Sequence, residues 1–463
     1  MIELRDIKSV YFVGIGGIGM SAIARYFLRK GVVVGGYDRT ATPLTDQLIS
    51  EGATIHYDED TAKIPQACLD AQHTLVVYTP AVPPEHSELL MFQQNGFNVM
   101  KRAQVLGLLT RAHKGLCVAG THGKTTTSAM CAHIMHKSHV DCNAFLGGIA
   151  KNYNSNYILS PKSDFVVIEA DEFDRSFHHL RPWMSVITAT DPDHLDIYGT
   201  KEAYLDAFGH YSSLIQPGGA LIIHRGLEMR PAVQPGVTIY DYSLDAGRFH
   251  AENIVIADGE ITFDFVSPIE SIPGVRLGNP IPINIENGIA AMAMAQLNGC
   301  TRDELLQGMA TYQGVDRRFD FKLKTSRIVF LSDYAHHPQE IRSSAASIRR
   351  LYSNRHITAI FQPHLYTRTQ DFYREFAEAL SQVDRVVLTD IYPAREQPIP
   401  GVTPRLIYDN LLPGIEKVIV PLDSVQDYVR SNDFDVLVVL GAGNLDDQVP
   451  AITDILRSKY EED

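Results

Sequence analysis

The sequence predicts an α/β protein whose mainly parallel sheets are covered by helices on both faces. Short apolar runs alternate with helix-length amphipathic stretches from one end of the chain to the other. The runs are apolar throughout, which is typical of parallel strands that are buried on both sides. The run Val10 to Val13 and the strand Leu116 to Ala119 each lead through a glycine-containing turn into a helix, as expected of doubly wound sheets. The runs are Val10 to Val13, Leu75 to Tyr78, Phe165 to Ile168, Ser185 to Thr188, Ile328 to Leu331, Ile357 to Phe361 and Val436 to Leu440.

A chain of 463 residues is too long for a single ordinary core, so several domains are expected. One boundary is predicted near residues 103–114, just before a strand that leads into a glycine-containing loop. A second is predicted near 312–326, where Gly314 to Phe319 precedes a fresh strand. We therefore expect domains at residues 1–107, 108–315 and 316–463, and a β-rich stretch of the middle domain between about 224 and 285.

The composition argues against a nucleic-acid-binding or membrane-spanning protein. The formal net charge is −14, whereas a nucleic-acid-binding protein needs a basic surface. The apolar runs are far shorter than the roughly 20 residues that span a bilayer, and the N-terminus does not resemble a secretory signal. Five scattered cysteines without a Cys-x-x-Cys pair indicate a reducing compartment and no structural zinc site. The predicted location is the cytoplasm, as a monomer or weak homo-oligomer.

A first candidate site follows the strand Val10 to Val13. Gly14, Gly16, Gly17 and Gly19 form a Gly-x-Gly-Gly-x-Gly turn that opens an amphipathic helix. Such glycines allow a tight turn and close approach of the backbone to a pyrophosphate at the helix N-terminus. Asp38, at the end of the next strand, is placed to meet a ribose hydroxyl. The pattern predicts nucleotide binding but does not distinguish NAD from a UDP-sugar, and an ordinary βα turn is the alternative.

A second candidate site is a phosphate loop between a strand and a helix. Its spacing is Gly-x-x-Gly-Lys-Thr, and Val118 stands where a strict Walker A sequence has its first glycine. In such a loop the amides cradle phosphates, Lys124 neutralises them, and the Thr125 hydroxyl can hold Mg²⁺. The predicted ATP-binding residues of the loop are Gly120, Thr121, His122, Gly123, Lys124, Thr125 and Thr126.

Acidic residues follow the next two buried strands. Glu169 to Glu172 end one strand, and Asp191 to Asp196, with His194 in its middle, follow the other. Because the ends of neighbouring parallel strands meet at one edge of a sheet, Glu169 and His194 are candidate ligands for phosphate-bound Mg²⁺. A solvated acidic turn and an ordinary loop histidine are the alternatives.

Two polar segments mark the third domain. Asp333 to Pro338 and Gln362 to Thr369 each follow a buried strand and therefore lie at the binding edge of an open α/β sheet. Either segment alone could be an ordinary loop. Together they predict a polar rim on this domain.

Taken in order, these blocks resemble the Mur ligase family, and the resemblance covers essentially the whole chain. The matching blocks are Gly-Thr-His-Gly-Lys-Thr-Thr-Thr, Glu-Ala-Asp-Glu, Asp-His-Leu-Asp, Arg-Arg-Phe and His-His-Pro. The resemblance implies an N-terminal Rossmann-like domain for UDP, a central P-loop ATPase-type α/β domain and a C-terminal Rossmann-like domain for an amino acid. The blocks of the first and third domains are most similar to members that use ATP to join L-alanine to the carboxylate of UDP-N-acetylmuramate through an acyl phosphate.

The resemblance also assigns roles at the ATP site. Lys124 would contact the ATP phosphates, and Thr125, Glu169 and His194 would serve Mg²⁺, for which Mn²⁺ could substitute. Asn284 and Asn287 match the family's Asn-x-x-Asn on the adenine side. Arg318 and Asp333 would approach ATP from the third domain, with Arg318 stabilising charge on the transferred phosphoryl group.

The amino-acid site implied by the resemblance consists of His337, His364 and Arg368. Of these, His337 is the preferred helper for loss of a proton from the amine. The chain departs from the family at three positions: Ile283 replaces a common histidine, Leu365 replaces an arginine of alanine-adding members, and Phe173 replaces a small residue. Gly209 stands where several members carry a modified lysine, so no such group is expected.

Three other functions remain open from the sequence. A recycling ligase of the same family attaches a preformed tripeptide to UDP-N-acetylmuramate. A nicotinamide-dependent dehydrogenase would explain the Gly14–Gly19 turn but not the phosphate loop. A non-catalytic nucleotide sensor would be free to lose Lys124, Glu169 or His194, and all three are present.

Overall fold

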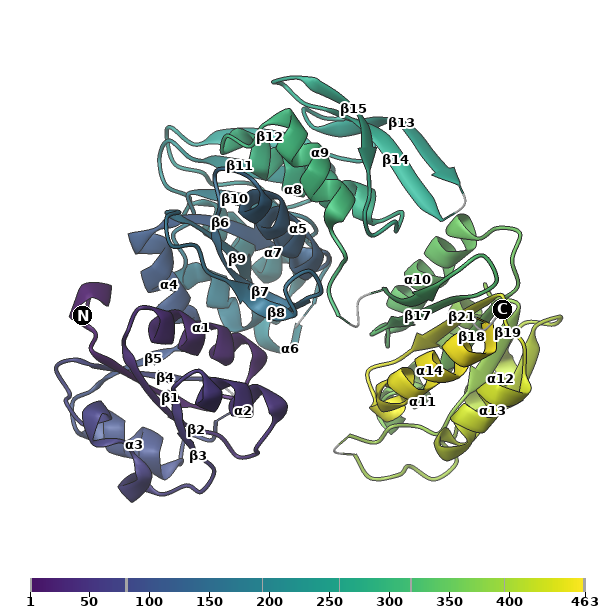
Figure 1. Cartoon of the computed structure of the whole chain (residues 1–463), viewed down its shortest axis with the longest axis horizontal. Helices are drawn as coiled ribbons and strands as arrows, with labels where there is room; N and C mark the ends of the chain where they lie inside the picture. Colours follow the sequence, from purple (N-terminus) through teal and green to yellow (C-terminus); the bar gives the residue numbers. More distant parts are fainter. Residues whose placement is uncertain are drawn as a thin grey trace. The chain divides into compact units, whose positions relative to one another are not determined.

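The computed structural model describes residues 2–79, 82–193, 195–257, 259–316, 319–394 and 396–460. The chain forms two compact units, which are described one at a time. The first consists of Met1–Asn253, Phe263–Gly278 and Ile285–Gln313, and the second of Ile254–Thr262, Asn279–Asn284 and Gly314–Asp463. Their sheets are mainly parallel and alternate with helices along the chain (Figure 1), which confirms the predicted α/β class.

The N-terminal part of the first unit is a five-stranded parallel sheet with the order β3-β2-β1-β4-β5. The order changes direction between β1 and β4, and ligands of open α/β sheets bind at such a point. Its strands are β1 (Ser9–Val13), β2 (Val33–Tyr37), β3 (Thr54–His56), β4 (Thr74–Tyr78) and β5 (Asn98–Lys101). Its helices are η1 (Leu4–Asp6), α1 (Ile18–Arg29), α2 (Pro43–Ser50), η2 (Thr61–Lys63), η3 (Gln66–Cys68), α3 (Ser87–Gln94) and α4 (Arg102–Ala112).

A seven-stranded sheet follows, with the order β12-β11-β10-β6-β9-β7-β8, in which β7 and β8 are antiparallel. Its strands are β6 (Lys114–Ala119), β7 (Asn143–Ala150), β8 (Ser155–Ile158), β9 (Phe165–Ala170), β10 (Met184–Ile187), β11 (Ala220–His224) and β12 (Thr238–Tyr242). Its helices are α5 (Lys124–Lys137), η4 (Phe173–His179), α6 (Leu195–Tyr198), α7 (Lys201–Ser212), α8 (Asn284–Leu297) and α9 (Arg302–Thr311). The expected β-rich stretch contains β12 and a separate sheet of β13 (His250–Ala257), β14 (Glu260–Val266) and β15 (Ser271–Arg276).

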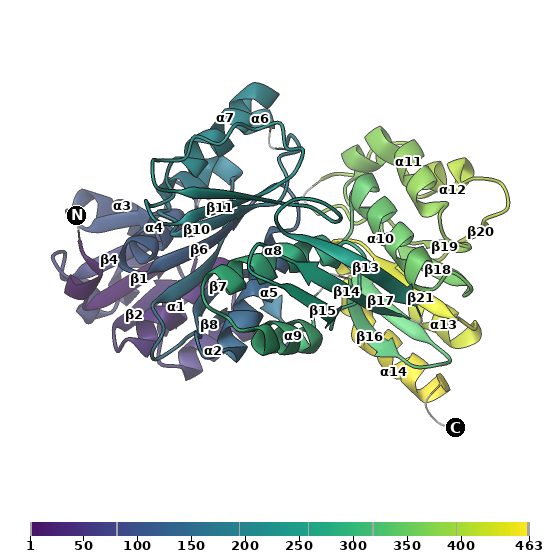
Figure 2. The same cartoon turned by 90° about the horizontal axis from the view of Figure 1, so that it is seen from above.

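The second unit contains a six-stranded sheet with the order β16-β17-β21-β18-β19-β20, in which β16 is antiparallel to β17. Helices α10, α11 and α12 cover one face, and α13 and α14 cover the other (Figure 2). Its strands are β16 (Asp320–Lys324), β17 (Val329–Asp333), β18 (Ile357–Phe361), β19 (Arg385–Leu388), β20 (Glu416–Ile419) and β21 (Val436–Leu440). Its helices are α10 (Pro338–Leu351), α11 (Tyr366–Leu380), α12 (Arg405–Asn410), η5 (Leu422–Ser424), α13 (Val425–Ser431), η6 (Asn444–Gln448) and α14 (Val449–Tyr460).

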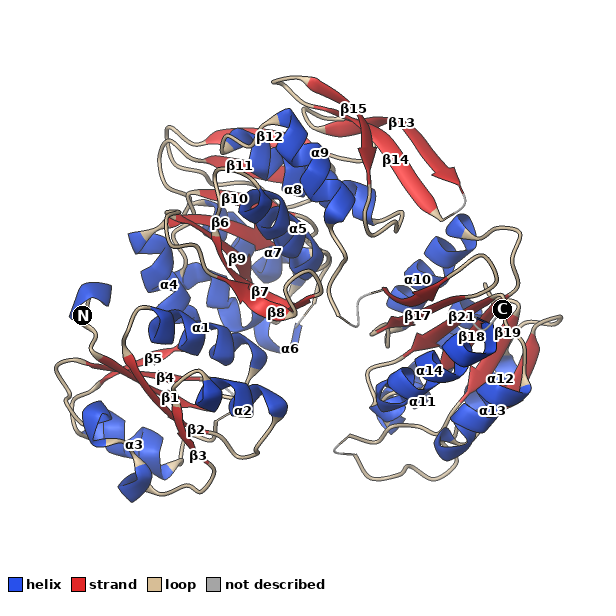
Figure 3. Cartoon of the chain, viewed as in Figure 1, coloured by secondary structure: helices blue, strands red, loops and turns tan. Residues whose placement is uncertain are grey.

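The central strands β1, β18 and β21 are buried along their whole length, and their side chains alternate between the two faces of the sheet. In β1, Val10 and Phe12 pack into the apolar cluster that includes α1, α2 and α4, whereas Tyr11 and Val13 pack into a second cluster with Phe92 of α3. Helices therefore cover both faces of the five-stranded sheet (Figure 3). Every helix of the described residues is too short or too polar to cross a membrane.

A buried histidine fixes the helix that follows the phosphate loop. His133 of α5 is 1% exposed, with Nδ1 2.7 Å from the Tyr153 hydroxyl and Nε2 2.9 Å from Thr311 Oγ1. Burial lowers the pKa of His133 from 6.5 to about 4, and Lys137 and His136 act in the same direction. The folded protein therefore keeps this ring neutral under conditions in which the unfolded chain would protonate it.

This difference predicts a pH-dependent stability. Between pH 6.5 and about 4 the unfolded state binds a proton at residue 133 that the folded state does not, so the free energy of unfolding should fall as the pH falls. The contribution is about 3 kcal/mol. We expect His133→Gln to remove much of this slope in urea titrations followed by the fluorescence of Trp183, the single tryptophan. The control His139→Gln, whose side chain is 65% exposed, should keep the slope, and an unchanged slope in His133→Gln would contradict the assignment.

Candidate active site

The glycine turn after β1 is hydrogen-bonded to the end of the neighbouring strand β2. The N–H groups of Gly14 and Ile15 donate to the Tyr37 carbonyl at 2.8 and 3.0 Å, and that of Gly16 donates to Asp38 Oδ2 at 2.7 Å. Gly14 has a φ of +89°, which suits glycine. The structure thus brings the predicted glycine turn and Asp38 together, and the carboxylate closes the turn.

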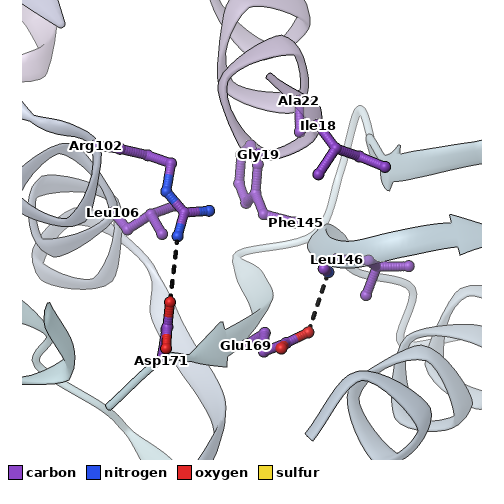
Figure 4. Close-up of a pocket in the computed structure, with 10 residues that line it drawn as sticks. Ile18, Gly19, Ala22, Arg102, Leu106, Phe145, Leu146, Glu169 and Asp171 are labelled. Carbon is purple, nitrogen blue, oxygen red and sulfur yellow. Dashed lines mark hydrogen bonds and ion pairs between the residues drawn. The ribbon is translucent and has the colours of Figure 1, made fainter. Parts of the chain in front are cut away.

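A cavity of about 220 Å³ lies between this turn and the tip of strand β9 (Figure 4). Its walls come from the first turns of α1 and α4, from β7, and from the segment at the end of β9. Glu169, the predicted metal ligand, therefore lines the same cavity as Gly19 of the glycine turn. The lining residues are Ile18, Gly19, Ala22, Arg102, Leu106, Phe145, Leu146, Gly147, Glu169 and Asp171.

Arg102 is a site residue that the sequence analysis missed. Its guanidinium lies against the first turn of α1, where a side chain at Gly19 would collide with Nη1. Nη2 lies 3.8 Å from Asp171 Oδ2, which is too far for a hydrogen bond. The signal in the sequence was an arginine directly after β5, where a parallel strand delivers its next residue to the binding edge.

Both glycines of the phosphate loop are required by close neighbours. Gly120 and Gly123 have φ values of +133° and +81°. A side chain at Gly120 would collide with Thr188 Oγ1, and a Cβ at Gly123 would lie 2.7 Å from Asn287 Oδ1. The same Asn287 oxygen accepts a hydrogen bond from Thr127 Oγ1 at 3.1 Å. The structure therefore places Asn287 beside the loop.

The rest of the loop is bonded to the segment after β10. Thr121 Oγ1 donates to the Asp191 carbonyl at 2.7 Å and lies 2.8 Å from the Tyr204 hydroxyl. His122 Nε2 lies 3.7 Å from Asp191 Oδ2. Burial raises the pKa of Tyr204 above its usual range, so its phenol stays neutral. These contacts hold the loop from one side.

Lys124 pairs with a carboxylate that the sequence analysis did not single out. Its Nζ donates to the Gly120 carbonyl at 2.7 Å and lies 2.9 and 2.8 Å from the two carboxylate oxygens of Glu172. Glu172 is 1% exposed. It follows Glu169 by three residues, and the acidic run alone did not show which member faces the lysine.

Two of the donors expected to hold a metal ion come from neighbouring βα units. Strands β6 and β9 pair in parallel; Thr125 lies in the first turn of α5, which follows β6, and Glu169 lies near the end of β9. Glu169 Oε2 accepts the Gly147 N–H at 3.1 Å. Hydroxyl and carboxylate oxygens are the ligand types that Mg²⁺ prefers. His194 lies outside the described residues, and within the described part no three His, Cys, Asp or Glu side chains form a metal-binding cluster.

In the second unit, Asp333 at the end of β17 is held by two donors. Oδ1 accepts the Phe319 N–H at 3.2 Å, and Oδ2 accepts the Ser344 hydroxyl. Asn284, another predicted ATP-binding residue, donates from Nδ2 to the Asn279 carbonyl at 3.2 Å. Arg318 lies outside the described residues.

His337 caps the N-terminus of α10. The Gln339 N–H donates to Nδ1 of His337 at 3.4 Å, and the His337 N–H donates to Glu340 Oε2 at 3.1 Å. The imidazole packs against Phe372 with ring centroids 5.4 Å apart.

His364 and Arg368 leave buried polar atoms without partners. The His364 ring lies 5.9 Å from that of His336 and 5.5 Å from that of Tyr392. Within the described part of the chain, His364 Nδ1 and Arg368 Nη1 are buried without a hydrogen-bond partner. Burial lowers the pKa of His364, and the positive charge of Arg368 lowers it further. Unpartnered buried donors at a sheet edge indicate a place for a polar ligand.

The residue that follows His364 is strained. Leu365 has a φ of +73°, which is uncommon for any residue other than glycine. Its N–H donates to the Tyr392 carbonyl at 2.9 Å, and its carbonyl accepts the Thr369 hydroxyl at 2.8 Å. These bonds maintain the conformation, and such strain is concentrated at functional sites.

Comparison with known proteins covers nearly the whole chain. Residues 9–114 match the Mur ligase family, catalytic domain; residues 118–295 match the Mur ligase middle domain; and residues 317–443 match the Mur ligase, glutamate ligase domain. The three successive matches confirm the predicted three-domain α/β architecture.

Two curated relatives carry the name UDP-N-acetylmuramate–L-alanine ligase. That of Phocaeicola vulgatus is 62% identical over 99% of this chain and 100% of its own, and that of Parabacteroides distasonis is 56% identical over 98% of both chains. A crystal structure of UDP-N-acetylmuramate-alanine ligase from Thermotoga maritima superposes with a TM-score of 0.80 at 26% identity, over 97% of this chain and 99% of the other.

The phosphate loop allows a matched test of its close packing. Gly123→Ala should strain the backbone and displace Asn287 from its bond with Thr127. Gly226→Ala is the control, because Gly226 has nearly the same φ, +83°, with open space around it. The control should lower the free energy of unfolding by about 1–2 kcal/mol, and Gly123→Ala by clearly more. Equal losses in urea titrations followed by Trp183 fluorescence would show that the packing against Asn287 is unimportant.

Proposed function

Because this chain belongs to the Mur ligase family, we propose that it joins L-alanine to the carboxylate of UDP-N-acetylmuramate, driven by ATP, in the synthesis of peptidoglycan precursors. The products are ADP, phosphate and the alanyl sugar nucleotide. The main support for the proposal is the full-length similarity of this chain to relatives named for this reaction. We place the reaction in the cytoplasm.

We assign residues 1–107 to the UDP-sugar, 108–315 to ATP and 316–463 to the amino acid. A carboxylate does not react with an amine near neutral pH, so the γ-phosphoryl group must first convert it to an acyl phosphate. The neutral amine then attacks the acyl carbon, phosphate leaves with the electrons of the broken C–O bond, and the proton lost from the nitrogen passes to the released phosphate. Lys124 and the loop amides stabilise charge on the transferred group, and Arg318 is assigned the same task.

Thr125, Glu169 and His194 are the proposed ligands of Mg²⁺. When bound, the ion neutralises phosphate charge. Glu169 fits this role because it lines the cavity described above.

We also propose that the diphosphate of the sugar nucleotide binds in this cavity. Gly14, Ile15 and Gly16 already use their N–H groups within the protein. The structure shows no acceptor, among the described residues, for the N–H groups of Ile18 and Gly19, which begin α1 and line the cavity. We therefore assign the diphosphate to these two amides and Arg102, whose planar guanidinium suits phosphate oxygens.

The third domain supplies the amino-acid site. His337 accepts a hydrogen bond at Nδ1, an arrangement that, in a neutral ring, places the proton on Nε2. That arrangement suits recognition of a carboxylate better than removal of a proton from an amine. Arg368 and His364, with their unpartnered nitrogens, are assigned to the carboxylate of alanine.

Varying the amine tests the proposed reaction. With ATP, Mg²⁺ and UDP-N-acetylmuramate, L-alanine should release phosphate and give a sugar nucleotide heavier by one alanine residue. D-Alanine should fail, and glycine or L-serine should be disfavoured by about 1–3 kcal/mol. Excess EDTA should stop the reaction. Preference for a tripeptide would indicate the recycling ligase, reduction of NAD a dehydrogenase, and ATP binding without turnover a sensor.

Arg368→Ala tests the amino-acid site. Loss of a charged hydrogen bond of about 1.5–3 kcal/mol should raise KM for L-alanine by at least about tenfold, with KM for ATP little changed. Arg374→Ala, an exposed arginine of the same helix, is the control and should leave both constants unchanged. A similar rise in both variants would argue against a direct contact between Arg368 and alanine.

A further inference from the structure

We propose that Glu172 is a positioning residue that competes with nucleotide phosphates for Lys124 and thereby sets the affinity of the phosphate loop. This inference rests on the proposed function, because it requires the loop to bind a nucleotide. It goes beyond that function by giving a role to a carboxylate that neither binds substrate nor holds metal in the proposal above.

The donors of the Lys124 ammonium are already used in the structure. Nζ donates to the Gly120 carbonyl at 2.7 Å, to Glu172 Oε1 at 2.9 Å and to the Thr121 carbonyl at 3.5 Å, and its ion-pair distance to Glu172 Oε2 is 2.8 Å. An ammonium group has three N–H donors. A phosphate that binds Lys124 must therefore replace at least one of these acceptors.

Glu172 cannot readily follow the lysine or turn toward water. Its side chain is 2% exposed, and its carbonyl accepts the Tyr198 hydroxyl and the Arg175 N–H, the latter at 3.0 Å. The Arg175 guanidinium lies 4.6 Å from the centre of the Tyr198 ring. The segment is thus fixed from both its backbone and its neighbour α6, so the exchange must occur by movement of Lys124.

The backbone conformation of this segment indicates that its surroundings fix the position of Glu172. Asp174 and Arg175, directly beyond Glu172 and Phe173, have φ values of +50° and +53°. Two successive non-glycine residues in this region are unfavourable unless the surroundings impose them. Phe177, 1% exposed and stacked on Tyr211 with centroids 4.7 Å apart, anchors the far end. The strained turn keeps the carboxylate directed at Lys124.

The negative charge of Glu172 explains how this residue lowers the affinity for nucleotides. Taking Lys124 away leaves a buried carboxylate without its cation, which is unfavourable. The lost ion-pair energy opposes nucleotide binding and is regained when the nucleotide dissociates. Glu172 therefore weakens the hold on ADP after reaction and, in the nucleotide-free protein, keeps the ammonium in the loop.

The test is the affinity of the full-length protein for ADP, measured by calorimetry. Glu172→Gln keeps the shape of the side chain but removes its charge, so ADP should bind about tenfold more tightly, as expected from loss of one competing charged hydrogen bond. In a Lys124→Ala background the same substitution should give no tightening. Asp174→Asn is the control, because it removes a charge from the same turn, where Asn tolerates a positive φ, and should leave ADP affinity unchanged.

The outcomes separate this inference from the proposed function. If the unsubstituted protein binds ADP but Glu172→Gln binds it equally or more weakly, the competition is wrong while the proposed function stands. If Glu172→Gln also tightens ADP in the Lys124→Ala background, the effect does not pass through the lysine and the inference fails. If the unsubstituted protein binds no ADP, both fail. If Glu172→Gln does not fold, Glu172→Asp can replace it. The shorter side chain reaches Lys124 less well, so this variant should also bind ADP more tightly.

Discussion

The parallel pairing of β6 with β9 on one side and β10 on the other determines where the chemistry of the first unit lies. Ala119 pairs with Ala170 in one direction and with Ile187 in the other. Three strands that are far apart in the sequence therefore end at the same level of one edge. The phosphate loop, the acidic segment after β9 and the Thr188–Asp191 segment meet there, and the contacts of Lys124, Thr121 and Gly120 all depend on this register.

This dependence explains how much the sequence could predict. Apolar runs identified the central strands, because burial on both faces leaves a strong compositional signal. The end of each run then marked the binding edge, which is why the predicted glycine turn, Asp38, the phosphate loop and Asn287 are found close to their expected neighbours. The predicted roles of these residues, and the exact domain boundaries, remain predictions.

The pairings between side chains could not be predicted in the same way. Glu169 and Glu172 lie in one short acidic segment, and only the turn after β9 determines that Glu172 faces Lys124 while Glu169 meets the Gly147 N–H. Arg102 escaped notice because it stands alone, without a motif. The tautomer suggested for His337 depends on one backbone N–H at a helix cap, which no spacing of residues reveals.

The positive φ of Leu365 has a consequence for how this protein can evolve. A glycine at this position would relieve the backbone, so selection for thermal stability alone would favour replacing the leucine. Yet Leu365 connects His364 to Arg368, and a more flexible residue would loosen the geometry that holds their unpartnered nitrogens in place. Variants selected only for heat resistance would therefore lose substrate recognition at this position. At Leu365, robustness and selectivity oppose each other.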